Sequence, residues 1–313
     1  MKLWLDVDTG SDDALAIMLA FRWPGASVLG ISCAPGNTPV VNVARNTLSL
    51  LDLIDAPATP VAIGMRSPLI EQLREPNPLH GRDGIGDLFL PASGRSLAPE
   101  HAVELLRGVL EAATEPISLV ALAPLTNIAV LIRMYPHLRE KIAMLMIMGG
   151  TYLHSGNTSP AAEFNIRQDP EAAAIVLASG WPITLYPLDP FIQTMFSRAE
   201  ILALEARPQK LLHTAGHIMH TVMDNLKREM STIGDAGALA VLLDGSHATT
   251  VRAPVSVELV GSVTRGSTVL DRRRNRNLSE WWDTSPHEID VITHVDAEYY
   301  KALYVNTLEK VPV

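Results

Sequence analysis

The sequence predicts an α/β fold with an open, mainly parallel central sheet flanked by helices, related to the Rossmann type. Short apolar runs alternate with segments of helical periodicity along most of the chain, as they do where right-handed βαβ units build a parallel sheet. The run at 143–148 is apolar throughout, which is typical of a strand covered by helices on both faces. Ligands of such sheets lie beyond the carboxyl ends of the strands, so a site is expected there.

Each expected element has its own signal in the sequence. Asp169 followed by Pro170, for example, is a helix cap with proline in the first turn. Strands are expected at residues 3–7, 27–33, 60–63, 117–121, 143–148, 183–186 and 289–294, with a hairpin indicated over 255–259 and 268–270. Helices are expected at 12–22, 42–53, 101–113, 125–134, 169–178 and 298–308, with a mostly helical region at 197–243. Residues 66–98 are rich in Gly, Pro, Arg and Asp and are expected to form a long functional loop.

The composition limits what the protein can be. The chain has 313 residues, 47% of them hydrophobic, which allows a sizeable core, and without repeats or a linker residues 1–313 are expected to form one domain. The formal charge of −9 argues against nucleic acid as a partner, since that needs a basic surface. The one cysteine, Cys33, excludes an internal disulfide. Because neither a signal peptide nor an apolar run of 18 residues is visible, we expect a cytoplasmic protein with no membrane partner.

The strongest chemical signal is a group of four carboxylates where the first strand ends. Asp6, Asp8, Asp12 and Asp13 lie within eight residues, and Gly10 between them permits a sharp turn. No Lys or Arg lies nearby in the sequence, and like charges so close together are unfavourable unless a cation joins them. Carboxylate oxygens favour hard cations, so Ca²⁺ or Mg²⁺ is the expected ligand. The alternative is that Asp12 and Asp13 merely cap the following helix.

The segment that holds these acids, DVDTGSDDA, resembles the N-terminal signature of the nucleoside hydrolases, D-x-D-x-G-x-D-D-A. The resemblance implies that Asp8 and Asp13 bind Ca²⁺ and that Asp12 contacts the ribose hydroxyls. It also implies that Asp8 takes a proton from a calcium-bound water, which then hydrolyses the N-glycosidic bond of a ribonucleoside. A divalent ion lowers the pKa of bound water, and an adjacent carboxylate can complete the deprotonation.

A second long segment, NTSPAAEFN at 157–165, resembles the N-x-T-P-A-A-E-F-N stretch of the same family. The resemblance implies that Asn157, Glu163 and Asn165 hydrogen-bond the ribose hydroxyls. Amides and a carboxylate together supply the donors and acceptors that a sugar needs. The alternative for one such segment is ordinary loop polarity, but two matches in the right order favour the family.

Shorter stretches resemble the family at other strand ends. On that resemblance Asn37 positions ribose or water, His80 in an H-G-x-x-G-x-G stretch approaches the substrate, and Met148 contacts the sugar or base. The backbone carbonyl of Leu122, where the family usually has Thr, would be a calcium ligand, as every residue can supply a carbonyl. Asp235 would be the last calcium carboxylate. The family also implies a homodimer or homotetramer.

The chain departs from the family immediately before Asp235. Many members carry His there, and some use it to protonate the leaving base, whereas this chain has Gly234. Other candidates for the leaving-group acid or base contact are His80, Tyr152, His154, His217, His220 and Trp281. Two other functions stay open: a phosphatase of the haloacid dehalogenase type, whose D-x-D motif fits less well because of Gly10, and a non-catalytic nucleoside-binding protein.

Overall fold

The computed structural model describes residues 1–74, 78–273 and 287–310. Its strands are β1 (Lys2–Val7), β2 (Ser27–Cys33), β3 (Val61–Ile63), β4 (Ile117–Ala121), β5 (Ile142–Met148), β6 (Ile183–Tyr186), β7 (Met195–Ser197), β8 (Met230–Thr232), β9 (Ala248–Val257), β10 (Thr268–Leu270) and β11 (Glu288–Val295). Its α-helices are α1 (Ser11–Arg22), α2 (Val40–Leu53), α3 (Ala102–Ala112), α4 (Thr126–Met134), α5 (Phe164–Gln168), α6 (Pro170–Leu177), α7 (Leu188–Phe191), α8 (Arg198–Glu205), α9 (Lys210–Asn225), α10 (Asp235–Leu243) and α11 (Ala297–Glu309). Two short 3₁₀ helices are η1 (Pro78–His80) and η2 (Pro136–Lys141).

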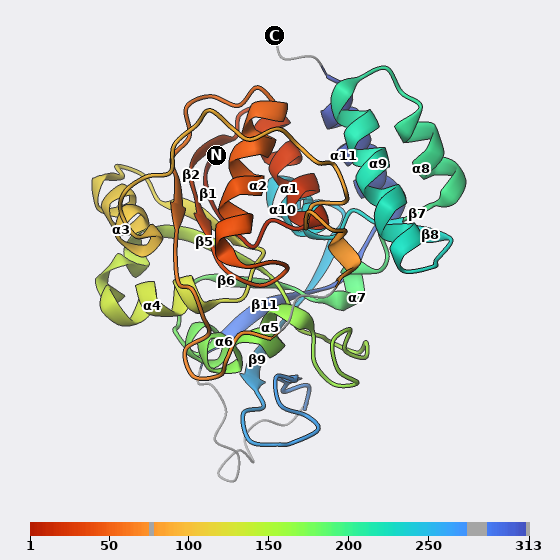
Figure 1. Ribbon diagram of the computed structural model, residues 1–313. Coiled ribbons are helices and arrows are strands. Elements are labelled where there is room, and N and C mark those ends of the chain that lie inside the picture. Colours follow the sequence, from red (N-terminus) through yellow and green to blue (C-terminus); the bar gives the residue numbers. More distant parts are fainter. Residues whose placement is uncertain (75–77, 274–286, 311–313) are drawn as a thin grey trace.

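The predicted open sheet is confirmed. Within the described residues, nine strands form one sheet in the order β10-β9-β11-β6-β5-β4-β1-β2-β3. The pairs from β11 to β3 are parallel, whereas β9 pairs antiparallel with both β11 and β10. Helices cover the sheet on both faces (Figure 1).

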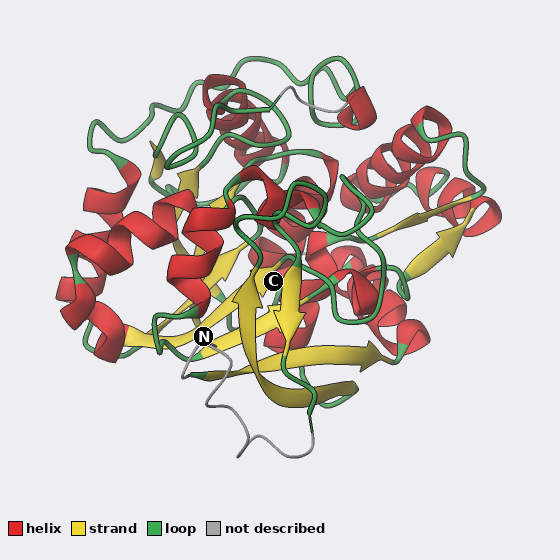
Figure 2. Ribbon diagram, turned by 90° about the horizontal axis from the view of Figure 1, so that it is seen from below, coloured by secondary structure: helices red, strands yellow, loops and turns green. Residues whose placement is uncertain are grey.

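Most expected elements occur within one or two residues of their predicted ends. The hairpin is present, but β9 begins seven residues earlier than predicted because it also pairs along β11. The region 197–243 is mostly helical, as predicted, but its helices α8, α9 and α10 are joined by short loops and by β8, which pairs with β7 in a separate two-stranded ribbon. Figure 2 shows this ribbon apart from the main sheet, beside neighbouring helices. In the described part of the chain no helix is both long and apolar enough to cross a membrane.

The alternation of side chains along β1 divides the core into two layers. Leu3, Leu5 and Val7 face the cluster formed with α1, α2, α9, α10 and α11, whereas Trp4 faces the cluster formed with α3, α4 and α6. All four side chains are fully buried. With both faces covered, the carboxyl edge of the sheet is the side left for a ligand.

Candidate functional site

The loops that leave β1, β2, β4 and β5 surround a cavity of about 710 Å³ at the carboxyl edge of the sheet. The cavity is lined by nine of the eleven residues that the sequence singled out: Asp12, Asn37, His80, Leu122, Met148, Asn157, Glu163, Asn165 and Asp235. The other two, Asp8 and Asp13, are fully buried and are hydrogen-bonded to Asn37. The structure therefore brings the whole predicted set to one place.

Carboxylates from two distant parts of the chain meet at one end of this cavity. Single carboxylate oxygens of Asp12, Asp13 and Asp235 all lie within 4.8 Å of one another. Asn37 donates from Nδ2 to Asp8 Oδ1 at 3.1 Å and to Asp13 Oδ2 at 3.2 Å, so it joins Asp8 to the same group. Asp12 also lies close enough to share an ion with Asp13 and Asp235, although the sequence comparison assigned it to the sugar.

Glycine permits the close approach of the second loop to the first. A Cβ atom at Gly36 would lie 1.9 Å from Oδ2 of Asp8, so any side chain there would displace this carboxylate. The neighbouring amide of Asn37 donates to the same oxygen at 2.7 Å. The turn after β2 is thus shaped around Asp8.

The carboxyl groups of this end repel one another and are removed from water. Burial, and then the charge of Asp12, raise the pKa of Asp13 to about 7. Burial and the neighbouring Asp13 and Asp12 charges also raise the pKa of Asp8 and of Asp235 well above the usual range. Such a group binds protons or a cation, since either reduces the repulsion.

Some of these acids also have structural partners. Asp13 accepts from the backbone amides of Gly10 at 2.9 Å and Asp8 at 3.2 Å, so it caps α1 as well as joining the cluster. Asp6 accepts from Ser32 and from Asn127 Nδ2, and burial raises its pKa to about 6. Asn127 lies in the first turn of α4, and its side chain ties this helix to β1.

Two residues predicted to bind the sugar, Glu163 and Asn165, are held by hydrogen bonds to backbone groups. Glu163 caps α5 by accepting from the amides of Asn165 at 2.8 Å and Ile166 at 3.1 Å, and burial raises its pKa to about 7. Asn165 donates from Nδ2 to the carbonyls of Leu122 at 2.9 Å and Met148 at 3.2 Å. The Asn165 amide therefore fixes the carbonyl that the family comparison implies as a calcium ligand.

The cavity also has an apolar end, which begins at Phe191 beside Gly234 and Asp12 and which was not predicted from the sequence. Its wall includes side chains from α7, β7 and α9: Phe191, Met195, Ile218, Met219 and Val222. These residues carry no family motif. The only available signal was the apolar stripe of the helix at 210–225, which points equally well to core packing.

His80 lies buried between the two ends. Its Nδ1 accepts from the Ser11 amide at 3.1 Å, so the proton of the neutral ring is on Nε2. Burial lowers the pKa of His80, although the nearby Asp12 carboxylate opposes this. His80 is thus a neutral hydrogen-bond donor at pH 7.

Only two of the described candidates for the leaving-group acid lie in the wall of the cavity. His80 and His154 line the cavity, whereas His217 and His220 bind the Glu205 carboxylate at 2.9 and 2.7 Å. Tyr152 is not among the lining residues, and Trp281 lies outside the described residues.

Gly234 could not be exchanged for a larger residue without movement. It has φ +54°, and a Cβ atom would lie 2.6 Å from Cβ of Asp12 and 3.3 Å from the Phe191 ring. Glycine here lets Asp12 and Phe191 stand close to Asp235.

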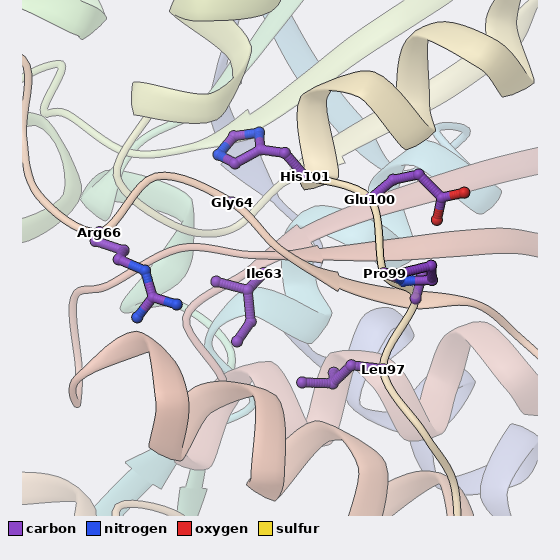
Figure 3. A pocket seen from close by; sticks show the side chains of 8 residues that line it. Ile63, Gly64, Arg66, Leu97, Pro99, Glu100 and His101 are labelled. Carbon is purple, nitrogen blue, oxygen red and sulfur yellow. The ribbon is translucent and has the colours of Figure 1, made fainter.

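A second, smaller cavity of about 330 Å³ lies between β3 and the start of α3. In Figure 3, Ile63 at the end of β3 projects toward Leu97, Arg66 in the segment after β3 lies to one side, and His101 lies above them. None of the predicted site residues lines it, so the larger cavity is the candidate site.

The fold and this cavity define a nucleoside hydrolase, an enzyme that hydrolyses the N-glycosyl bond of ribonucleosides. The chain belongs to the family described as inosine-uridine preferring nucleoside hydrolases, whose family model matches residues 3–302.

Curated relatives and solved structures agree with this assignment. The chain is 37% identical to a pyrimidine-specific ribonucleoside hydrolase, RihA, of Enterobacter sp. (strain 638), over 87% of this chain and 88% of the relative. It is 33% identical to the inosine-uridine preferring nucleoside hydrolase of Crithidia fasciculata, over 99% of this chain and 98% of the relative. The solved structure of an inosine-guanosine nucleoside hydrolase is similar with a TM-score of 0.93 and 31% identity over 99% of both chains.

Proposed function

We propose that the chain hydrolyses ribonucleosides to base and ribose with a calcium-assisted water. The observation that carries this proposal is the meeting of three buried carboxylates, Asp8, Asp13 and Asp235, with the partly exposed Asp12, and none of the four forms an ion pair with a Lys or Arg among the described residues. Membership of the family favours this reading over a phosphatase.

The residues fit a hard cation. Carboxylates of Asp8, Asp13 and Asp235 and the carbonyl of Leu122 offer oxygen atoms alone, as Ca²⁺ prefers. The pKa values of these acids are raised. Carboxylates that together bind a cation would have such raised pKa values when the cation is absent. When bound, the ion would lower the pKa of a water molecule next to the sugar.

The protein's own groups perform the remaining steps. Asp8, fully buried and tied to Asn37, accepts the proton of the attacking water. Asp12 has an Oδ1 atom without a partner among the described residues, and it binds the vicinal hydroxyls with Asn165. Negative charge beside the ring stabilises the oxocarbenium-like transition state.

The leaving base occupies the apolar end. His80 donates from Nε2 to it, since Nδ1 is occupied by the Ser11 amide. The named relatives differ in base preference, from pyrimidine-specific to inosine-guanosine, and the apolar wall is compatible with either class. We further expect a cytoplasmic homodimer or homotetramer.

The test is release of free ribose from a panel of purine and pyrimidine nucleosides, with calcium and with a chelator. Calcium-dependent release from at least one nucleoside is the expected result. Tight nucleoside binding with no release from any of them would instead support the non-catalytic binding protein.

A further inference from the structure

The loop that follows η1 is folded around one carboxylate. Oδ1 of Asp83 accepts from the backbone amides of Ile85 and Asp87, both at 2.9 Å, and Oδ2 accepts from the amide of Phe89 at 2.7 Å. Two of these donors are strained, since Asp87 has φ +55° and Phe89 has φ +46°, a conformation that is uncommon outside glycine. Strained residues persist where the surrounding structure holds them. In this loop the Asp83 carboxylate is the group that holds both.

The folded loop returns to His80, which lines the cavity. The amide of Gly86, within the segment that Asp83 gathers, donates to the His80 carbonyl at 2.8 Å. Gly86 has φ +82° and lies against α9, since a Cβ atom there would be 3.3 Å from Cα of Ile218. Figure 1 shows η1, which ends at His80, beside α9. The backbone of His80 is thus fixed from the loop, while its ring accepts from the Ser11 amide.

Two further contacts attach the middle of the loop to the rest of the fold. Ile85 is 1% exposed and belongs to the core layer that includes α2. Asn46 of α2 donates from Nδ2 to the Asp83 carbonyl at 3.0 Å. Because neither contact uses the Asp83 carboxylate, a change in that group should alter the path of the chain toward His80 without detaching the loop.

The geometry points to Asp83 as a positioning residue, which sets the imidazole of His80 at the distance from the leaving base that hydrogen-bond donation requires. This inference rests on the proposed function, in which Nε2 of His80 donates to the base. Asp83 is not among the described residues that line the cavity, so it acts through the loop backbone. A misplacement of about 1 Å in a catalytic group can lower the rate about 100-fold.

Asp83→Asn tests this with no change in side-chain shape. The Asn oxygen can keep the amides of Ile85 and Asp87, but its NH₂ group would face the Phe89 amide, which is also a donor. We expect kcat/KM on a nucleoside to fall by about 10-fold to 100-fold. On a nitrophenyl β-ribofuranoside, whose leaving group departs as a stable anion without help from His80, it should change by less than about twofold. The sugar is the same in both substrates, so the comparison isolates the leaving group.

Asp87→Asn is the matched control. Oδ1 of Asp87 accepts from the Arg82 amide at 2.7 Å and lies 3.7 Å from Nε of the same residue. Asn keeps the acceptor and tolerates the left-handed conformation, so kcat/KM on both substrates should match the wild type. Asp83→Asn combined with His80→Ala should be no slower than His80→Ala alone, because no ring would be left to position.

The His80 ring offers a measurement that needs no turnover. We expect its ¹⁵N NMR shifts to move in Asp83→Asn, since the hydrogen bond from the Ser11 amide would change, and to stay in place in Asp87→Asn. No loss on the nucleoside, equal losses on both substrates, independent effects of Asp83→Asn and His80→Ala, or unmoved ring shifts would each overturn the inference. Failure of the wild type to release ribose from either substrate, with the ring shifts moved in Asp83→Asn, would contradict the proposed function and leave the positioning of His80 by Asp83 standing.

Discussion

Two groups of carboxylates in this molecule have opposite environments. In the cavity, Asp13 and Glu163 are buried and their pKa values are raised to about 7. On the outer helices, Glu200 is partly buried, but Lys301 at 2.7 Å and Ser197 outweigh that burial and lower its pKa to about 2. The second arrangement stabilises the fold, whereas the first destabilises it until a ligand arrives. Buried acids that have no cationic partner in the protein therefore distinguish the functional site from the rest of the molecule.

The largest expected effect comes from removing a charge in the cavity. Asp13→Asn should lower kcat/KM by about 10³-fold or more, since a bound metal ion contributes several kcal/mol to such a reaction. In chelator the same variant should melt at a higher temperature than the wild type, because one repulsive charge is gone. Steady-state kinetics and a thermal melt measure the two effects. A variant that loses stability in chelator would show that Asp13 serves mainly to cap α1.

A smaller effect is expected from Gly234→Ala, which places a methyl group against Asp12. The positive φ and the 2.6 Å approach should reduce stability by about 1–3 kcal/mol and lower kcat/KM by displacing Asp12. Gly108→Ala, in α3 with nothing within 4 Å of the new methyl group, should gain about 0.5–1 kcal/mol and keep full activity. Unimpaired kinetics in Gly234→Ala would contradict the place of Asp12 in the site.

The stability of the chelated protein should depend on pH in the direction set by the cavity acids. The folded chain holds protons on Asp13 and Glu163 up to about pH 7, whereas the unfolded chain loses them near pH 4. The protonated acids thus contribute stability that is full below pH 4 and is lost as the pH rises through 7. We expect a higher melting temperature at pH 5.5 than at pH 8 in chelator. Calcium should reduce this difference, and an equal slope with and without calcium would count against the cluster as its site.

The smallest effect is expected on the outer helices. Glu200→Gln removes the ion pair to Lys301 and weakens the cap of α8, which should cost about 1 kcal/mol. The melting temperature should fall by a few degrees and kcat/KM should not change. A loss of activity would mean that the two groups of acids are coupled.

The sequence predicted the sheet and the polar end of the cavity because both depend on local patterns. Apolar runs that alternate with helical segments define the strands. The D-x-D-x-G-x-D-D motif follows the first strand directly, so its acids lie at the carboxyl end of that strand. The apolar end depends on contacts among α7, β7 and α9, which are far apart in the sequence and have no fixed spacing.

In the proposed mechanism, the cavity carboxylates hold the calcium ion that hydrolysis requires. The most direct measurement is a titration of calcium into chelated protein, with ribose release followed on a nucleoside that the protein accepts. We expect activity to be absent in chelator and to return fully at one calcium ion per chain, with no return in Asp13→Asn. Full activity in chelator would contradict it.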